Sequence, residues 1–159
     1  MTKDGKPVEA ITKKVTLEKE YTMAFMYPFS KEKGSLVFYN EDLARFTGNN
    51  WLNDNCMELW IRKMVIDHET SDVYVLPSLF FNKYFQGGKK KDIFDQMTKW
   101  IHMDRLETCK YLAIPISGKN HWSLCVIVNP LDMPLRKISL IDSLNNYHDI
   151  DIIASIMLV

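Results

Sequence analysis

Apolar side chains recur at intervals of three and four after residue 56, which is the spacing of one face of an α-helix. They are Met57, Trp60, Ile61, Met64 and Val65. Asn55 and Glu58 have the spacing of a capping box at the start of this helix, and the apolar stripe ends near Asp67. Residues 92–101 have the same spacing and predict a second helix.

Three strands are predicted further along the chain, over residues 111–116, 122–128 and 137–142. The middle one, WSLCVIV, is an almost unbroken apolar run, which is typical of a strand buried on both faces with helices on each side of the sheet. Shorter segments of strand followed by helix are expected over residues 35–46 and 73–85. Because helices come first and strands follow, the order of elements favours an α+β fold.

The composition is that of one globular domain. The chain has 159 residues, 47% of them hydrophobic and 25% charged, and its formal net charge is zero. A neutral chain lacks the positive field that attracts phosphates, so we expect no nucleic-acid partner. No apolar run approaches the ~18 residues that a membrane helix needs, so no membrane association is expected either. Residues 1–20 are polar and aperiodic, and we interpret them as an N-terminal extension of a domain over residues 21–159.

The three cysteines, Cys56, Cys109 and Cys125, are odd in number and far apart. This pattern argues against a secreted disulfide framework, and the lack of a CxxC pair argues against a structural zinc site. The charged N-terminal residues also contain no apolar signal-peptide core. We therefore expect an intracellular, reducing location with buried thiols, and a monomer that needs no metal and no cofactor.

His121 and Asp142 are the candidate catalytic residues. His121 precedes one predicted strand and Asp142 ends the next, and the short connection between these strands favours an antiparallel pair. If Val128 lies near Lys137, Ser123 faces Asp142 and His121 lies diagonally beside it, so both side chains meet at one sheet edge. A carboxylate there can orient the imidazole and stabilise the imidazolium, which is half of a nucleophilic triad. The alternative is a surface histidine and a turn-forming aspartate, and the spacing alone favours that alternative.

Three motifs in order resemble the ubiquitin-like protease family, the SUMO-specific (sentrin-specific) cysteine proteases. The motifs are NNWLNDNCMELWI (49–61), YLAIPISGKNHWSLCVIV (111–128) and KISLIDSLNN (137–146). The resemblance implies a papain-like cysteine protease fold of this family's type, with helices and a small mixed or antiparallel sheet, here without its C-terminal part. It also implies a peptidase that cuts after the diglycine tail of a ubiquitin-like modifier, most of all SUMO, in the nucleus or cytoplasm.

The resemblance assigns roles to five residues. His121 would be the base and Asp142 its orienting acid. Trp51 and Trp122 are similar to the two tryptophans that line the family's substrate tunnel, where flat indoles can close over a tail without side chains. Asp54 is similar to the family's acidic contact to a basic residue of the modifier. The residues alone leave a second interpretation open, in which both tryptophans are core residues and Asp54 is a favourable charge at a helix N-terminus.

The sequence departs from the family at the nucleophile. In the family, a cysteine follows the aspartate by several tens of residues, shortly after an oxyanion-hole glutamine, and the 17 residues after Asp142 contain neither. Residues 151–159 have the pattern of an amphipathic helix, which we expect to begin a further element. The sequence therefore predicts either an incomplete protease that is inactive alone, or a pseudoprotease that binds a ubiquitin-fold modifier, or a fragment that does not fold stably.

Three other thiols are candidate substitutes for that cysteine. Cys56 is the best of them, because a thiol in the first turn of a helix has a lowered pKa. The more favoured interpretation is that Cys56 is a small buried hydrophobe. Cys125 should be inert within a buried strand, and Cys109 has no evident base as a partner.

Overall fold

The computed structural model of the protein describes residues 22–27, 35–68, 72–86, 98–118 and 120–144. The predicted N-terminal extension and the predicted helix over residues 151–159 lie outside these ranges. Of the second predicted helix, residues 92–97 also lie outside them, and residues 98–100 form a turn rather than helix.

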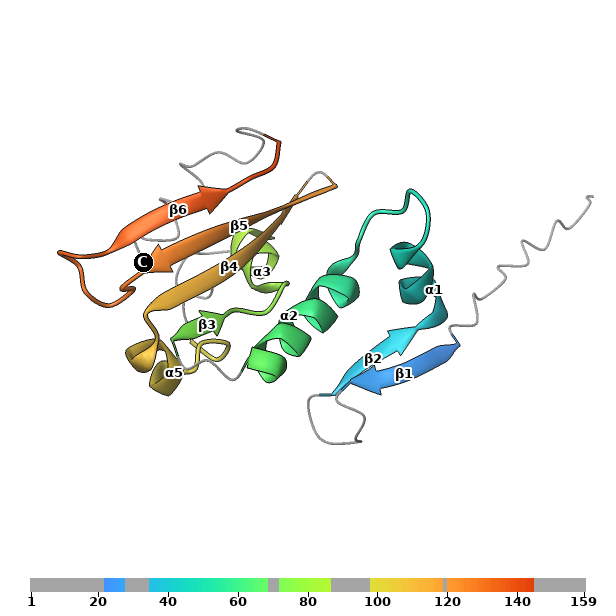
Figure 1. The fold of residues 1–159 in the computed structure, drawn as a ribbon, viewed down its shortest axis with the longest axis horizontal. Coiled ribbons are helices and arrows are strands. Elements are labelled where there is room, and N and C mark those ends of the chain that lie inside the picture. The colour runs from blue at the N-terminus through green and yellow to red at the C-terminus, as the bar shows by residue number, and fades with distance from the viewer. Residues whose placement is uncertain (1–21, 28–34, 69–71, 87–97, 119, 145–159) are drawn as a thin grey trace, which may run out of the picture.

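The described elements form two sheets, with α2 running between them (Figure 1). In chain order they are β1 (Met23–Tyr27), β2 (Leu36–Tyr39), α1 (Asn40–Leu43), the 3-10 helix η1 (Ala44–Phe46), α2 (Asp54–His68), β3 (Val73–Val75), α3 (Phe80–Gln86), α5 (Met103–Thr108), β4 (Tyr111–Gly118), β5 (His121–Val128) and β6 (Lys137–Ile141). Strands β1 and β2 pair antiparallel and form the smaller sheet. None of the described helices is both long and apolar enough to span a membrane.

The larger sheet is mixed and has the strand order β3-β4-β5-β6. Strand β3 is parallel to β4, whereas β4, β5 and β6 are successive antiparallel neighbours. All three strands predicted in the second half of the chain are confirmed, as are the short strand and helix within residues 73–85. The predicted α+β class with a small mixed sheet is therefore confirmed.

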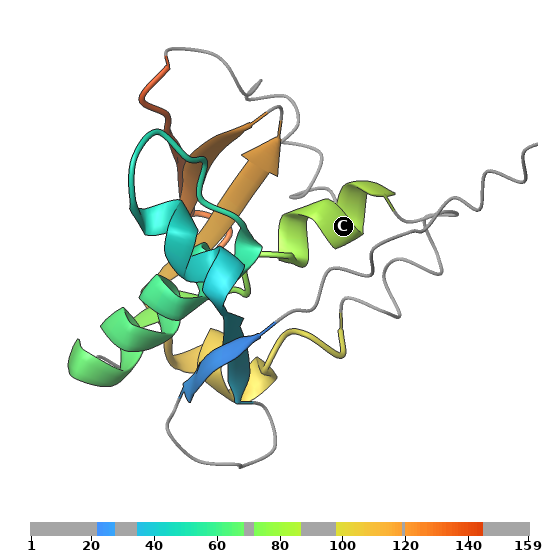
Figure 2. The ribbon, with the colours of Figure 1, turned by 90° about the vertical axis from the view of Figure 1, so that its right-hand side faces the viewer.

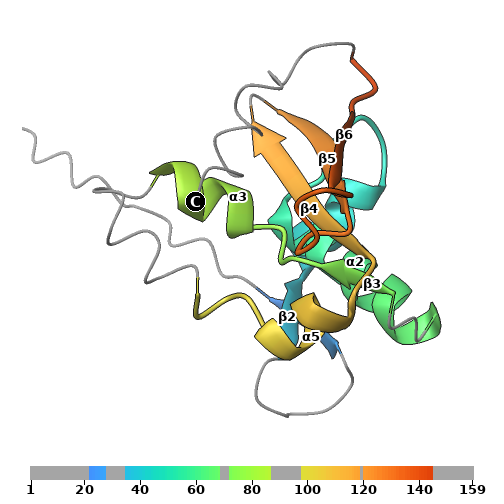
Figure 3. The ribbon, with the colours of Figure 1, turned by 90° about the vertical axis from the view of Figure 1, so that its left-hand side faces the viewer.

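One face of the four-stranded sheet carries the hydrophobic core. The buried residues on this face are Tyr74 of β3, Leu112, Ile114 and Ile116 of β4, and Cys125 and Ile127 of β5. Phe80 and Phe81 join them from α3, which lies on one side of the sheet in the two opposite views of Figures 2 and 3. Along β5 buried residues alternate with half-buried ones, so the burial on both faces that was expected for this strand is wrong, and β4 is instead the strand whose successive residues are buried.

Helix α2 confirms the predicted helix after the WLND motif, and it ends at His68. The predicted capping box is wrong, because the cap is Asn53, whose side-chain oxygen accepts a hydrogen bond from the Cys56 backbone N–H at 3.0 Å. The Glu58 carboxylate instead accepts a bond from the backbone N–H of Ser78, in the turn before α3. The helix is thereby tied to the segment that follows β3.

We predict that Ile114→Ala lowers the free energy of unfolding by about 2–5 kcal/mol, because the Ile114 side chain is 1% exposed and its loss leaves a cavity. The matched control is Ile141→Ala on β6, where the side chain is 60% exposed and the cost should stay below about 1 kcal/mol. Urea denaturation of both variants measures the two values. Equal destabilisation would contradict the assignment of the core to the face that α3 covers.

Candidate active site

His121 and Asp142 are in direct contact. The imidazole Nε2 of His121 lies 2.6 Å from Oδ1 of Asp142, a short distance that is typical of a charge-assisted hydrogen bond. Both side chains are largely shielded from solvent, with exposed fractions of 10% and 5%. The backbone N–H of Leu144 also donates to Oδ1 of Asp142 at 2.9 Å, so the carboxylate is held from a second direction. In this arrangement the Asp142 carboxylate can orient the His121 imidazole and stabilise its protonated form.

The pairing of β5 with β6 brings these two residues together. Val128 lies opposite Lys137 and Leu124 opposite Ile141, so continuing the ladder by one position sets Ser123 beside Asp142. His121 is two residues before Ser123 and therefore on the same face of the sheet. The predicted register, and the contact that it implies, are confirmed.

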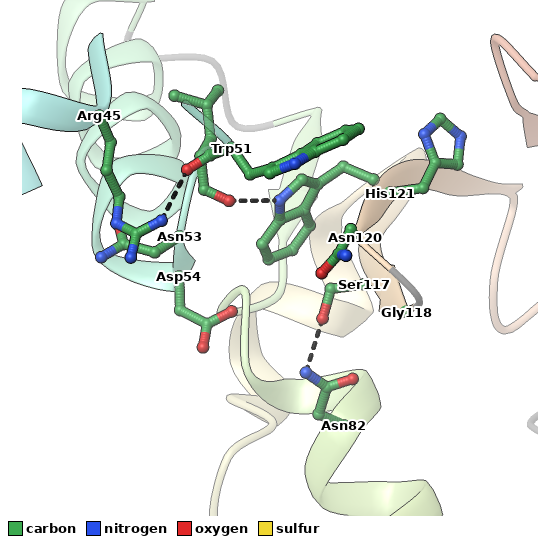
Figure 4. Close-up of a pocket in the computed structure, with 11 residues that line it drawn as sticks. Arg45, Trp51, Asn53, Asp54, Asn82, Ser117, Gly118, Asn120 and His121 are labelled. Carbon is green, nitrogen blue, oxygen red and sulfur yellow. Dashed lines mark hydrogen bonds between the residues drawn. The ribbon is translucent and has the colours of Figure 1, made fainter. Parts of the chain in front are cut away.

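A cleft of about 450 Å³ lies beside this pair. One side comes from the segment between η1 and α2, the other from the β4–β5 hairpin, and α3 contributes from below (Figure 4). The lining residues are Arg45, Trp51, Leu52, Asn53, Asp54, Asn82, Ser117, Gly118, Asn120, His121 and Trp122. The four sequence-predicted site residues Trp51, Asp54, His121 and Trp122 thus line one cleft, and Asp142 adjoins it through His121.

The two tryptophans do not behave as core residues. The Trp51 side chain is 62% exposed, although it sits on a well-anchored segment. The Trp122 indole N–H donates to the backbone carbonyl of Leu52 at 3.0 Å, which joins the hairpin to the segment that carries Trp51. An exposed indole at the edge of a cleft is suited to ligand contact rather than to packing.

Residues 51–53 are held by polar contacts that sequence reasoning missed. The Arg45 guanidinium donates to the Trp51 carbonyl at 2.9 Å, as Figure 4 shows. The Asn53 amide donates to Oδ1 of Asp42 at 2.6 Å, and Asp42 is only 5% exposed. Burial opposes ionisation of Asp42, but hydrogen bonds from Asn53, Tyr39 and Asn55 outweigh it and lower the pKa of the carboxyl.

Three further polar side chains line the cleft. The Asn82 amide of α3 donates to the Ser117 hydroxyl of β4 at 2.6 Å (Figure 4). Asp54 projects into the cleft from the first turn of α2, and burial raises the pKa of its carboxyl. Of these side chains, the sequence predicted only Asp54. Asn82 and Ser117 are 35 residues apart, and no local sequence pattern indicates their contact.

None of the three cysteines lines the cleft. Cys56, Cys109 and Cys125 are all buried free thiols. Burial raises the pKa of each, for Cys125 to about 11. Cys56 lies in the first turn of α2 as predicted, but it is fully buried and burial raises the pKa of its thiol, so it is a small buried hydrophobe and not an activated nucleophile. Among the described residues no group of three potential His, Cys, Asp or Glu metal ligands occurs.

A family model described as the Ulp1 protease family, C-terminal catalytic domain, matches residues 50–159. This chain belongs to the Ulp1 protease family. The match begins just before Trp51 and includes His121 and Asp142. The resemblance given by the WLND, HWSL and DSL motifs is therefore confirmed as family membership.

Relatives in the Ulp1 family are similar to this chain at moderate identity. Ubiquitin-like-specific protease 2 of Saccharomyces cerevisiae is 27% identical over 111 residues, which cover 65% of this chain and 10% of that protein. Sentrin-specific protease 3 of Homo sapiens is 30% identical over 107 residues, which cover 67% of this chain and 17% of that protein. The chain thus spans no more than a fifth of the length of these curated relatives.

A solved structure described as a de-sumoylating protease superimposes on this chain with a TM-score of 0.63 at 26% identity. The superposition covers 89% of this chain and 56% of the solved one. The predicted fold of the Ulp1 protease type is therefore confirmed.

We predict that all three thiols of the native protein react slowly with Ellman's reagent at pH 8, and Cys125 most slowly. With its pKa near 11, the thiolate of Cys125 is about a hundredfold scarcer at that pH than a thiol at its ordinary value of 9.0. Comparing the native protein with the protein in denaturant provides the measurement. One rapid equivalent in the native state would show that a thiol is accessible, against the burial described here.

Proposed function

We propose that this chain carries most of the catalytic apparatus of a cysteine peptidase that cleaves after the diglycine tail of a ubiquitin-fold modifier. The observation that carries this proposal is the 2.6 Å contact between His121 and Asp142 at the rim of a cleft flanked by two tryptophans. His121 serves as the base and Asp142 as the group that orients it.

The geometry of the pair supports a definite proton path. Asp142 engages Nε2 of His121, so a nucleophilic thiol is deprotonated at Nδ1. The resulting thiolate attacks the carbonyl carbon of the last glycine, and the imidazolium then protonates the leaving amine as the C–N bond breaks. Water hydrolyses the thioester with the same imidazole as base, which frees the thiol and the modifier's carboxylate. The Asp142 carboxylate stabilises the imidazolium in both steps.

The cleft suits a tail without side chains. Trp51 and Trp122 come from opposite walls, and the Trp122–Leu52 hydrogen bond fixes the distance between those walls. A diglycine segment can lie flat against indole faces where a larger side chain would clash. Trp51 and Trp122 are therefore proposed as substrate-binding residues.

SUMO is the proposed modifier. The relatives are named as ubiquitin-like-specific and sentrin-specific proteases, and the solved structure is described as a de-sumoylating protease. Asp54, which points into the cleft, is proposed to contact a basic residue next to the tail. Its carboxylate lies across the cleft from the hairpin wall (Figure 4).

The nucleophile is proposed to come from sequence outside these 159 residues. All three thiols of the chain are buried, and none lines the cleft, so none is available to His121. Because triad members act as a unit, the chain alone should bind the modifier without turning it over.

The second candidate function is a binding module without activity. It is favoured by the same combination of intact cleft walls and no thiol between them. The coding sequence after Val159 separates the two candidates. An in-frame continuation that encodes a glutamine and a cysteine supports the peptidase, whereas a stop codon supports the binding module.

We predict that SUMO with its diglycine tail shifts the indole NMR signals of Trp51 and Trp122, and that SUMO lacking the two glycines does not. Trp51→Ala should weaken binding on the order of tenfold to a hundredfold, because an exposed tryptophan in a cleft is a typical hot spot. The control is Trp60→Ala, since Trp60 is 50% exposed on α2 but does not line the cleft. Tail-independent binding, or equal loss in both variants, would reject the tail-binding role.

In the enzyme completed with its cysteine, we predict that His121→Ala lowers kcat/KM by about four to six orders of magnitude while modifier affinity stays within about twofold. The reason is that His121 supplies the base, whereas the indole walls supply binding. Steady-state hydrolysis of a SUMO C-terminal amide, together with a direct titration, gives both values. A parallel loss of affinity would contradict the separation of roles.

A further inference from the structure

The buried carboxylate of Asp42 forms a hydrogen-bonded chain that ends at the cleft. Its Oδ2 accepts from the Tyr39 backbone N–H and from the Asn55 amide, each at 3.0 Å. Its Oδ1 accepts from the Asn53 amide at 2.6 Å, and Asn53 in turn accepts from the Cys56 backbone N–H. Every contact on the carboxylate is therefore a donor, and the directions of all four bonds are fixed.

The segment over residues 51–53 is anchored at each of its residues. Arg45 holds the Trp51 carbonyl, Trp122 holds the Leu52 carbonyl, and Asp42 holds the Asn53 side chain. Only the Asp42 anchor is deeply buried and charged, and such hydrogen bonds are the strong ones. The Trp51 side chain is 62% exposed, so the anchors on its backbone segment contribute strongly to its position.

We propose that Asp42 is a positioning residue, which sets the Trp51 wall of the cleft through Asn53. This proposal deepens the proposed function, because the wall it sets is the one that would contact the diglycine tail. Asp42 does not line the cleft, so it acts through Asn53 and not on the substrate.

Because the directions of these hydrogen bonds are fixed, the positioning role of Asp42 can be tested with substitutions that keep the shape of the side chain and change only its donors and acceptors. In Asp42→Asn, the side chain keeps one accepting oxygen. If that oxygen stays with Tyr39 and Asn55, the new NH₂ faces the NH₂ of Asn53. Turning the Asn53 amide over then sets its NH₂ against the N–H of Cys56. Turning the new amide over instead sets its NH₂ against the Tyr39 N–H, so every arrangement leaves two donors face to face.

The double variant Asp42→Asn with Asn53→Asp restores the match. The amide at position 42 donates to the carboxylate at position 53 and still accepts from Tyr39 and Asn55. The carboxylate at position 53 still accepts from Cys56, and aspartate is as good a helix N-cap as asparagine. The swap keeps shape and net charge, and it reverses only the direction of one hydrogen bond.

The experiment compares the indole NMR signals of the wild-type 159-residue chain, Asp42→Asn and the swap. We expect Asp42→Asn to displace or broaden the Trp51 and Trp122 signals, while those of Trp60 and Trp100, outside the cleft, stay in place. The swap should return all four signals to their wild-type positions. SUMO affinity should fall about tenfold in Asp42→Asn and recover to within about twofold in the swap. Asp132→Asn, in an exposed loop, is the control for a lost surface charge.

Unmoved Trp51 and Trp122 signals in Asp42→Asn would overturn the proposal. A purely structural role predicts lower thermal stability with the indole signals in place, so that outcome also counts against positioning. Should Asp42→Asn not fold, the swap decides: native indole signals support the proposal, and displaced signals or a failure to fold overturn it. Absence of SUMO binding by the wild-type chain rejects the proposed function alone, because the indole positions are measured without SUMO.

Discussion

The antiparallel pairing of β5 with β6 is the constraint on which the candidate active site depends. Side chains alternate across a strand, so a slip of one residue would turn Asp142 to the opposite face from His121. The ladder from Val128 opposite Lys137 to Leu124 opposite Ile141 is continuous, and Cys125 and Ile127 keep the core face of β5 buried. Burial of that face therefore specifies the register, and the register specifies the contact between imidazole and carboxylate. The hydrophobic core and the candidate chemistry are linked through one strand.

The cleft depends on other interactions, since one of its walls belongs to the four-stranded sheet and the other does not. The hairpin wall is formed by the paired ends of β4 and β5, whereas the opposite wall is an irregular segment between η1 and α2. Such a segment carries backbone polar groups that need partners. Arg45 and Trp122 satisfy two of its carbonyls, and Asn53 links it to the buried Asp42. The irregular wall is thus held by directional hydrogen bonds where the regular wall is held by strand pairing.

The sequence was sufficient for strands β4, β5 and β6, and the register that brings His121 to Asp142 follows from a period of two and a short connection, but strand β1 was not predicted and the spacing alone did not favour a catalytic pair. It was insufficient for the N-cap of α2, because asparagine is a good capping residue at both position 53 and position 55. In the structure Asn53 caps the helix, whereas the Asn55 amide donates to Asp42. It was also insufficient for Asp42, an acidic residue in a first helical turn, which is ordinarily solvated. Its partners Asn53 and Asn55 follow 11 and 13 residues later, and no local pattern encodes that contact.

The thiols of this chain are buried away from the cleft, so the cleft walls do not depend on them. Cys56 is fully buried against the Asp42 carbonyl, and Cys125 is fully buried in the sheet, so both sulfurs are used for packing. The walls that would hold a tail and the pair that would activate a thiol are nevertheless both present in the described residues. In the proposed function, the nucleophile would therefore join this arrangement from an independent element. The same independence means that loss of a nucleophile need not remove recognition, which is the physical basis on which one fold can serve as a peptidase or as a binding module.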